Sequence, residues 1–470
     1  MIALSLFILP ILAGLVMLNS PSLSAKRLAS AIGLVMILIV SAAWIRSAYG
    51  ITDEFHLSLI EKIGFNASFL LSGPSLAMAL LTAVAAFLIP ITAFGKDHDS
   101  PHRFYGWMMV MIGAMMGAFI TTNALFFYLC YELALIPIFF MILKWGQGEH
   151  LTKIVTRFFL YTLFGSLFML LSILYVQSTM EVASFEMADM IKAANALSSA
   201  EQGWILAGFF IAFAVKMPVF PFHSWQPSTY DHAPIQGTML LAAVMLKMAT
   251  FGLAYWVLPM VPQGIKEHGQ WAVVLSVISV IYASLMAINQ KRLKLLIAYS
   301  SVAHVGMISA GLLSNTDQGT VGGYFEMFSH GLLAIALFAV YTMIENRVGH
   351  DKMNEMGGIR TSNPTFAFLF FILVMGSVAL PFTSGFVGEF LLIQGLSHIS
   401  LLWAGIAGLS VILGAAYMLR GFQKMMLGNN TTPFAALSSA ELWVLGGAVV
   451  LVILLGIYPA PLLNLIQMTF

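Results

Sequence analysis

Fourteen long apolar stretches occupy most of this sequence and limit what it can fold into. Sixty per cent of the 470 residues are hydrophobic and 9% are charged, whereas a soluble protein carries about 25% charged residues. The composition therefore predicts a chain embedded in a lipid bilayer. Because an open strand leaves backbone polar groups unpaired in lipid, each stretch is expected to be a helix. The stretches cover residues 1–19, 28–47, 67–94, 105–121, 123–144, 157–177, 203–221, 236–258, 271–289, 295–313, 321–344, 363–399, 401–419 and 440–460.

Two of these stretches carry helix-breaking residues in related places. Pro218 and Pro221 end span 7, and span 12 is too long for one straight helix and contains Pro381 and Gly385. Proline removes a backbone donor and clashes with the preceding turn, so both spans are expected to be broken helices. Because the two spans are five apart, they run in opposite directions, as two inverted five-helix repeats would place them.

The sequence thus predicts an all-α polytopic membrane protein with about 14 spans in one membrane domain, residues 1–470. Its expected parts are an N-terminal section of three spans (1–104), a first repeat (105–258, spans 4–8), a second repeat (271–419, spans 9–13) and a C-terminal span (440–470). Identity between the halves is too weak to show the repeat, so this division rests on span parity and the two breaks.

Basic residues are distributed unequally between alternate loops. With span ends counted in their loops, the loops after odd-numbered spans hold fifteen Lys and Arg residues and the other loops hold four. The fifteen are Lys26, Arg27, Lys96, Arg103, Lys144, Lys153, Arg157, Lys291, Arg292, Lys294, Arg347, Lys352, Arg360, Arg420 and Lys424. Cytoplasmic loops carry such an excess, so both termini are expected on the periplasmic side of a bacterial inner membrane. An organellar inner membrane is the alternative.

Four ionisable side chains lie inside the apolar stretches rather than in loops: Glu132, Lys216, Lys247 and Glu389. Each costs roughly 2.5–3.5 kcal/mol at mid-membrane on insertion scales. Such residues usually mark an ion path, and the proton is the leading candidate. The alternative is structural salt bridges that tie helices together, although a buried ion pair is weak evidence of net stability.

Two histidines, His304 and His330, fall at similar depth in spans 10 and 11. Together with the four charged residues they predict a polar axis parallel to the membrane. Either histidine alone is also explained by a hydrogen bond to a neighbouring helix. His223, at the broken end of span 7, is at least as well explained by a structural role. A loop with Tyr230, Asp231 and His232 is either a proton entrance or a solvated turn, and the turn is favoured.

Several function classes are disfavoured. The single cysteine, Cys130, excludes an intrachain disulfide and a Cys-ligated iron–sulfur cluster built by this chain alone. The sequence has no glycine-rich phosphate loop and no metal-ligand cluster of convincing spacing, so no cofactor or metal is expected on this chain. No basic run indicates nucleic acid, and the first apolar stretch lacks the basic start of a signal peptide.

Motifs in the right order resemble those of the antiporter-like subunits of respiratory complex I, the proton-pumping NADH–quinone oxidoreductase. The resemblance covers about span 4 to span 13. The motifs are Phe213-Ala214-Val215-Lys216-Met217-Pro218, Pro221-Phe222-His223-Ser224-Trp225-Gln226-Pro227, Leu246-Lys247-Met248, Leu296-Ile297-Ala298-Tyr299-Ser300-Ser301, Ser329-His330-Gly331 and Gly385-Phe386-Val387-Gly388-Glu389-Phe390.

The resemblance implies a subunit that translocates protons without redox chemistry of its own. NADH, FMN, iron–sulfur clusters and quinone are then expected in partner subunits, and the partners are the lipid bilayer and other membrane-arm subunits of the chain L and N types. Those relatives typically have lysine where this chain has Glu389. Its loop 227–234 departs from the family's Pro-Asp-Ala-His pattern, which puts any loop-histidine role in doubt.

These residues suggest a proton-transfer hypothesis. Bringing Glu132 near Lys216 would raise the proton affinity of the lysine, and separating them would lower it. Lys216 is then the loading site, Lys247 passes protons through His304 and His330, and Glu389 releases them. The alternatives are an Mrp-type Na⁺/H⁺ antiporter subunit, a membrane subunit of a related hydrogenase or ferredoxin–quinone complex, and a membrane scaffold without transport.

Overall fold

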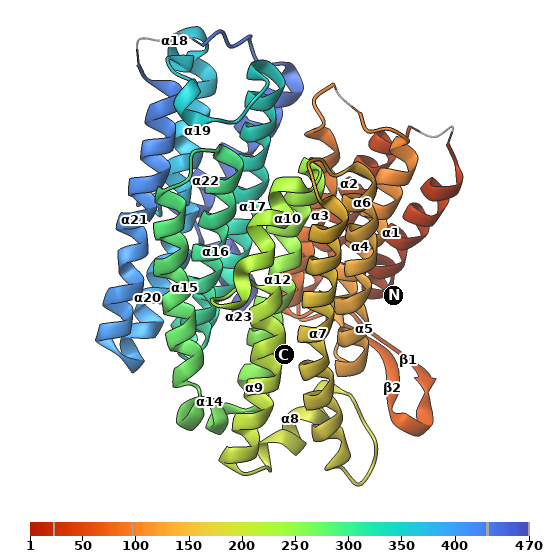
Figure 1. The fold of residues 1–470 in the computed structure, drawn as a ribbon. Helices are drawn as coiled ribbons and strands as arrows, with labels where there is room; N and C mark the ends of the chain where they lie inside the picture. The colour runs from red at the N-terminus through yellow and green to blue at the C-terminus, as the bar shows by residue number, and fades with distance from the viewer. Residues whose placement is uncertain (22–23, 96, 429–431, 469–470) are drawn as a thin grey trace.

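A computed structural model describes residues 1–21, 24–95, 97–428 and 432–468. Lys96, which contributes to the predicted charge bias, lies outside these ranges. The described chain is a bundle of long, roughly parallel helices (Figure 1). Because the sequence between the polar loops is almost continuously apolar, helices satisfy its backbone without help from water.

Twelve described helices are long and apolar enough to cross a membrane, and they match twelve of the predicted spans. Ten are single helices: α1 (Ile2–Asn19), α2 (Ala25–Ala48), α3 (Gly73–Ile91), α4 (Pro101–Ile120), α7 (Leu151–Ser178), α15 (Gln270–Ile288), α16 (Leu293–Leu312), α17 (Asp317–Val348), α21 (Leu401–Met426) and α22 (Ser439–Ile457). The span Ala124–Trp145 combines α5 (Ala124–Leu133) with α6 (Leu135–Trp145). The span Ile235–Met260 combines α11 (Ile235–Leu240), α12 (Leu246–Gly252) and α13 (Leu258–Met260) with two π-helical segments, Leu241–Met245 and Leu253–Val257.

The remaining two predicted spans are the ones expected to be broken. Span 7 is α9 (Ser199–Lys216), which stops before Pro218 and is followed by a 3₁₀ turn (Phe222–Trp225) and α10 (Gln226–His232). Span 12 is divided into α19 (Pro364–Ser377) and α20 (Ser384–Ile399), so Pro381 lies in the break and Gly385 in the first turn of α20. The sequence located both interruptions correctly.

One small element of the described chain is a β-hairpin rather than a helix. Strands β1 (Glu54–Ile60) and β2 (Phe65–Leu70) form an antiparallel hairpin that projects from the lower end of the bundle in Figure 1. The predicted span 3 (67–94) includes part of β2, because the residues of β2 are as apolar as the helix that follows. The Glu186 carboxylate accepts hydrogen bonds from Asn66, Ser68 and Asn123, which fix the hairpin against the start of α5.

Short helices complete the described α-helices: α8 (Met187–Asn195), α14 (Pro262–His268), α18 (Ile359–Ser362) and α23 (Ala460–Gln467).

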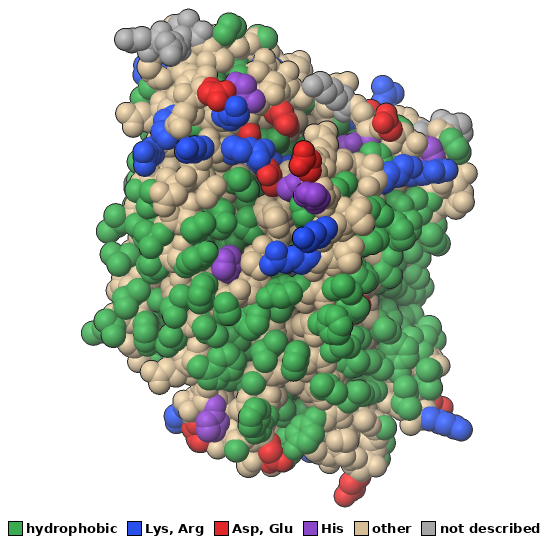
Figure 2. Space-filling model, viewed as in Figure 1, with side chains coloured by type: hydrophobic (Ala, Val, Ile, Leu, Met, Phe, Trp, Pro, Cys, Tyr) green, Lys and Arg blue, Asp and Glu red, His purple; other side chains and the backbone are tan. Residues whose placement is uncertain are grey.

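The spans differ in how much of each is buried inside the bundle. The most apolar windows of α17 and of Ile235–Met260 are 100% and 94% buried, against 28% for α2 and α21. Figure 2 shows an apolar band between charged ends, with most visible Lys and Arg at the upper end. Polar side chains on α17 and α12 are therefore removed from both water and lipid.

Candidate functional site

The six predicted site residues lie on six inner segments of the bundle. Lys216, Lys247, His330 and Glu389 are buried, with 5% or less of each residue exposed, and Glu132 and His304 are partly buried. They come from α5, α9, α12, α16, α17 and α20.

Lys216 is the last residue of α9, and the helix ends there for a local reason. Pro218 has no backbone donor, and Val219 N donates instead to Ala214 O at 2.9 Å. The break leaves carbonyl groups without helical partners. Trp225, from the 3₁₀ turn, fills one of these places by donating from its indole nitrogen to Val215 O at 2.7 Å. Two carbonyl groups at the break thus have hydrogen-bond partners. The break also places the buried Lys216 ammonium group at a helix C-terminus, where the helix dipole favours positive charge.

The ammonium group of Lys216 contacts Tyr131 rather than Glu132. Its Nζ donates to Tyr131 O at 2.5 Å and lies 3.4 Å from the centre of the Tyr131 ring. Among the described residues, no ion pair within 4 Å joins Lys216 to Glu132, and Glu132 Oε1 is buried without a hydrogen-bond partner. The structure therefore holds the predicted pair on neighbouring helices but separated.

Lys247 lies between the two π-helical segments of its span. A π-turn displaces one backbone hydrogen bond, and such bulges are frequent at functional sites. Lys247 Nζ donates to Ala242 O, within the first π segment, at 2.6 Å. The same Nζ lies 2.6 Å from His330 Nδ1 on α17. This local geometry was not predictable from the residue types alone.

From His330 the polar contacts continue across the second half of the chain. The rings of His330 and His304 have centroids 5.3 Å apart. His304 Nδ1 lies 2.8 Å from Glu389 Oε1 on α20. The spatial order is therefore Lys247, His330, His304, Glu389, although His304 precedes His330 in the sequence. These four residues therefore form a run of neighbouring titratable groups.

Sequence reasoning missed a further charged residue, Glu326 on α17. It is 1% exposed, and one oxygen atom each from Glu326 and Glu389 and one ring nitrogen of His304 all lie within 4.8 Å of one another. The signal was present, because Glu326 falls inside the predicted span 321–344, one helical turn before His330. Its position opposite α20 was not predictable from the sequence, because it depends on how the helices pack.

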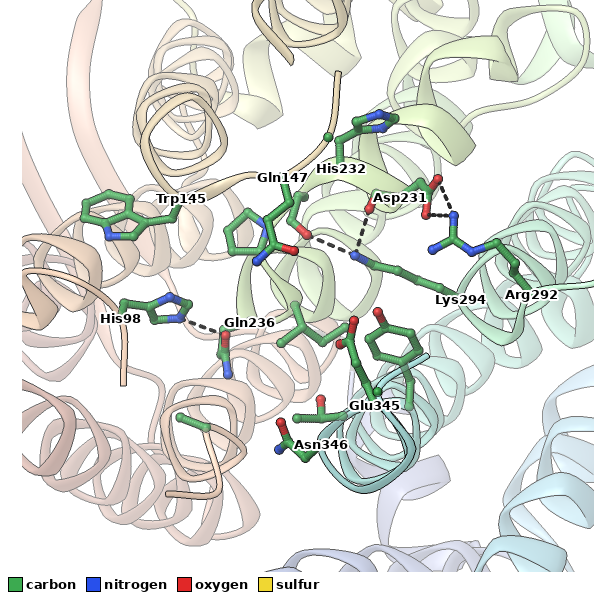
Figure 3. Close-up of a pocket in the computed structure, with 18 of the residues that line it drawn as sticks. His98, Trp145, Gln147, Asp231, His232, Gln236, Arg292, Lys294, Glu345 and Asn346 are labelled. Carbon is green, nitrogen blue, oxygen red and sulfur yellow. Dashed lines mark hydrogen bonds and ion pairs between the residues drawn. The ribbon is translucent and has the colours of Figure 1, made fainter. Parts of the chain in front are cut away.

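A second polar region opens at the end of the bundle that carries most basic residues. This vestibule is a cavity of about 670 Å³ lined by residues of α10, α11 and α17 and of the segments near residues 93–98 and 145–148. Figure 3 shows Lys294, Asp231, Arg292 and Gln236 around it, with Glu345 and Asn346 of α17 on the facing wall. Lys294 Nζ donates to Asp231 O and Ala233 O, each at 3.0 Å.

The vestibule corrects the expectation of a solvated turn at residues 230–232. These residues belong to helix α10, and Tyr230 is fully buried. Asp231 pairs with Arg292 at 2.7 Å, and His232 Nδ1 lies 2.8 Å from Ser228 O. Asp231 and His232 both line the cavity. Apolar packing of Tyr230 under the helix, rather than hydration, therefore fixes this segment.

Two more histidines have ordered surroundings. His98 Nε2 lies 2.9 Å from Gln236 Oε1 in Figure 3. Burial lowers the pKa of His98, although the hydrogen bond to Gln236 acts in the opposite direction, so the imidazole is largely neutral at pH 7. His223 packs its ring against Phe220 and Tyr282 at 5.7 and 4.8 Å between centroids, which fits the structural role weighed for it.

Comparisons with known proteins identify the family of this chain. Residues 121–415 match the family described as NADH:quinone oxidoreductase/Mrp antiporter, transmembrane. The chain is 35% identical to NADH-quinone oxidoreductase subunit M of Rickettsia bellii, over 88% of this chain and 84% of that protein. It is 32% identical to NADH-ubiquinone oxidoreductase chain 4 of Arabidopsis thaliana, over 98% and 94%.

Solved structures give the same fold. A chain of respiratory complex I from Thermus thermophilus matches with a TM-score of 0.91 and 29% identity, over 99% of this chain and 98% of that one. A chain of the Mrp complex from Dietzia matches with a TM-score of 0.88 at 18% identity, over 99% and 95%, which shows shared fold alone. Glu389, in place of the lysine of chains L and N, indicates the subunit M type, and the relatives confirm it. The chain therefore belongs to the NADH:quinone oxidoreductase/Mrp antiporter family, as an antiporter-like complex I subunit of the M (chain 4) type.

Proposed function

We propose that this antiporter-like subunit moves protons across the membrane along its buried polar residues, driven by electron transfer in other subunits. One observation carries the proposal. Lys247, His330, His304 and Glu389 form a run of neighbouring titratable groups through the most buried part of the bundle, with 2.6 and 2.8 Å contacts at its two ends. Intramembrane ionisable groups are expensive, and a run of four that can each take or give a proton exceeds what helix packing needs.

In the first half of the chain, Lys216 is the path residue whose proton affinity is proposed to change with the position of Glu132. Lys216 is held by a backbone carbonyl and an aromatic face, and nearby Glu132 Oε1 is buried without a hydrogen-bond partner among the described residues. Movement of Glu132 toward Lys216 would stabilise the charged lysine, and its withdrawal would favour loss of the proton. The separated arrangement corresponds to the state in which Lys216 releases its proton toward Lys247. Because these groups interact, they titrate as a set.

The vestibule is the proposed proton entrance. Its walls carry Asp231, Glu345, His98 and His232, which are groups that hold water and exchange protons. It lies at the end of the bundle with most basic residues, and the positive-inside rule makes that end cytoplasmic. Both termini are then periplasmic in a bacterial inner membrane, or on the corresponding side of an organellar one.

The expected assembly follows from family membership. Chains of the L and N types are the proposed neighbours in the membrane arm, and NADH, FMN, iron–sulfur clusters and quinone are assigned to partner subunits. The domain proposal keeps spans 4–8 (105–258) and 9–13 (271–419) as inverted repeats, between an N-terminal part (1–104) and a C-terminal span (440–470). The helix breaks after Lys216 and Ser377 support that division.

Proton pumping per NADH in vesicles carrying the complete complex tests the proposal. In Lys216→Ala, assembly is expected to be normal and pumping to fall by at least about tenfold, the order of effect of removing a positioned proton-transfer group. Lys153→Ala, which removes an exposed lysine from α7, is the matched control. Wild-type pumping in assembled Lys216→Ala would contradict the proposal and would leave the buried charged residues with a structural role only. Pumping that requires Na⁺ and not NADH would favour the Mrp-type alternative.

A further inference from the structure

Glu326 is a buried carboxylate that has no role in the proton path proposed so far. It projects from α17 one turn before His330, so both side chains lie on one face of that helix. Its Oε2 is buried without a hydrogen-bond partner among the described residues. An unpaired buried carboxylate costs several kcal/mol in general, which a packing role alone does not repay.

The neighbours of Glu326 are themselves members of the path. Its carboxylate, that of Glu389 and a ring nitrogen of His304 lie within 4.8 Å of one another and come from three helices. A small cavity beside them is lined by Glu326, His304, His330, Ser300 and Ser301.

The charges facing this cluster are few. His304 contacts Glu389, and His330 contacts Lys247. No Lys or Arg nitrogen of the described chain lies within 4 Å of either carboxylate. Glu389 Oε2, like Glu326 Oε2, is buried without a hydrogen-bond partner. The two carboxylates therefore have one imidazole between them and no fixed cation of their own.

The backbone of α20 is shaped to admit Glu326. Gly388 precedes Glu389, and a Cβ placed on Gly388 would collide with Glu326 Oε2, Cβ and Cα. The missing side chain lets the Glu326 carboxylate lie directly against α20, beside Glu389. A glycine at this point thus positions one acid next to the other.

Two carboxylates this close in a low-dielectric site do not both stay charged, because their mutual repulsion adds to the cost of desolvation. We propose that Glu326 and Glu389 hold one proton between them, so that Glu326 is a second proton-carrying acid at the far end of the path. This inference rests on the proposed function. The proton leaves His304 Nδ1 as its N–H bond breaks, and an O–H bond forms at the Glu389 carboxylate. The pair then holds two protons, and loss of one of them to the outer side restores the single negative charge that the two carboxylates share.

Proton pumping per NADH by the complete complex in vesicles tests the assignment. Glu326→Gln is expected to assemble normally and to lose pumping by at least about tenfold, as for other positioned proton-transfer groups. Glu326→Asp, which keeps the acid, is expected to recover most of it. Asp317→Asn, which removes an exposed acid from the start of α17, is the matched control and is expected to pump normally.

Two further comparisons separate proton sharing from packing. Gly388→Ala is expected to reduce pumping, because its Cβ displaces the Glu326 carboxylate. Gly395→Ala adds a Cβ at another close contact of the same two helices, against Gly319, and is expected to pump better than Gly388→Ala. The double variant Glu326→Gln/Glu389→Gln is expected to lose no more than the worse single variant, because residues acting as a unit are not additive.

The reference variant for interpretation is Lys216→Ala in the same vesicles. If Lys216→Ala stops pumping while Glu326→Gln pumps as the wild type, the Glu326 assignment is wrong and the proposed function stands. If both pump normally, the proposed function fails first. Equal losses in Gly388→Ala and Gly395→Ala, or additive losses in the double variant, would make Glu326 a packing residue.

Discussion

At the scale of single residues, the second half of the site is defined by contacts that match acid with base. His304 Nδ1 lies 2.8 Å from Glu389 Oε1, and Lys247 Nζ lies 2.6 Å from His330 Nδ1. Glu326 adds an acid that no Lys or Arg nitrogen of the described chain contacts within 4 Å. The balance of charge near Glu389 therefore depends on Glu326 as much as on His304.

This balance predicts the behaviour of Glu389→Lys. A lysine there gains Glu326 as a counter-charge, so the variant is expected to keep a measurable part of wild-type pumping in assembled complex. Adding Glu326→Gln removes the counter-charge and is expected to abolish the remainder. Complete loss of pumping in Glu389→Lys with normal assembly, or equal pumping in the single and double variants, would contradict this account.

At the scale of elements, three interruptions of helical geometry place the site. α9 ends at Lys216, α19 ends at Ser377, and π segments flank Lys247. The sequence located the first two, because proline removes donors at recognisable positions. It did not reveal the two π segments, because no proline marks them. It also did not reveal the hairpin, because β2 is as apolar as the start of α3.

The break after α9 depends on one side-chain donor, Trp225. Trp225→Phe leaves Val215 O without that partner, and a buried polar group left unpaired costs roughly 1–3 kcal/mol. The melting temperature for unfolding of this subunit, measured in the purified complex, is expected to fall. Trp204→Phe is the control, because Trp204 lies in α9 itself and is 78% exposed. Equal melting temperatures for both variants would show that the indole hydrogen bond does not hold the break.

At the scale of the whole molecule, burial increases toward α17 and Ile235–Met260, and the path follows that most buried region. The sequence predicted the class of protein and both helix breaks, because its composition is strongly apolar and proline removes backbone donors at recognisable positions. It also predicted six candidate path residues, because charge inside apolar segments is costly, and their part in proton transfer stays a prediction. Its hypothesis that Glu132 and Lys216 move together and apart stays a prediction, and the structure shows the separated arrangement, with no ion pair between them within 4 Å. Neither the adjacency of Lys247 and His330 nor that of Glu326 and Glu389 was predictable, since each depends on how distant helices rotate against each other.

The most direct test of a continuous buried path is proton pumping per NADH in vesicles whose complex carries Lys247→Met. Methionine keeps the length and burial of the side chain but cannot hold a proton, and it breaks the contact with His330. The account predicts normal assembly and a loss of at least about tenfold in pumping, with Lys266→Met, an exposed lysine in α14, unaffected. Wild-type pumping in assembled Lys247→Met would contradict the path from Lys247 to Glu389.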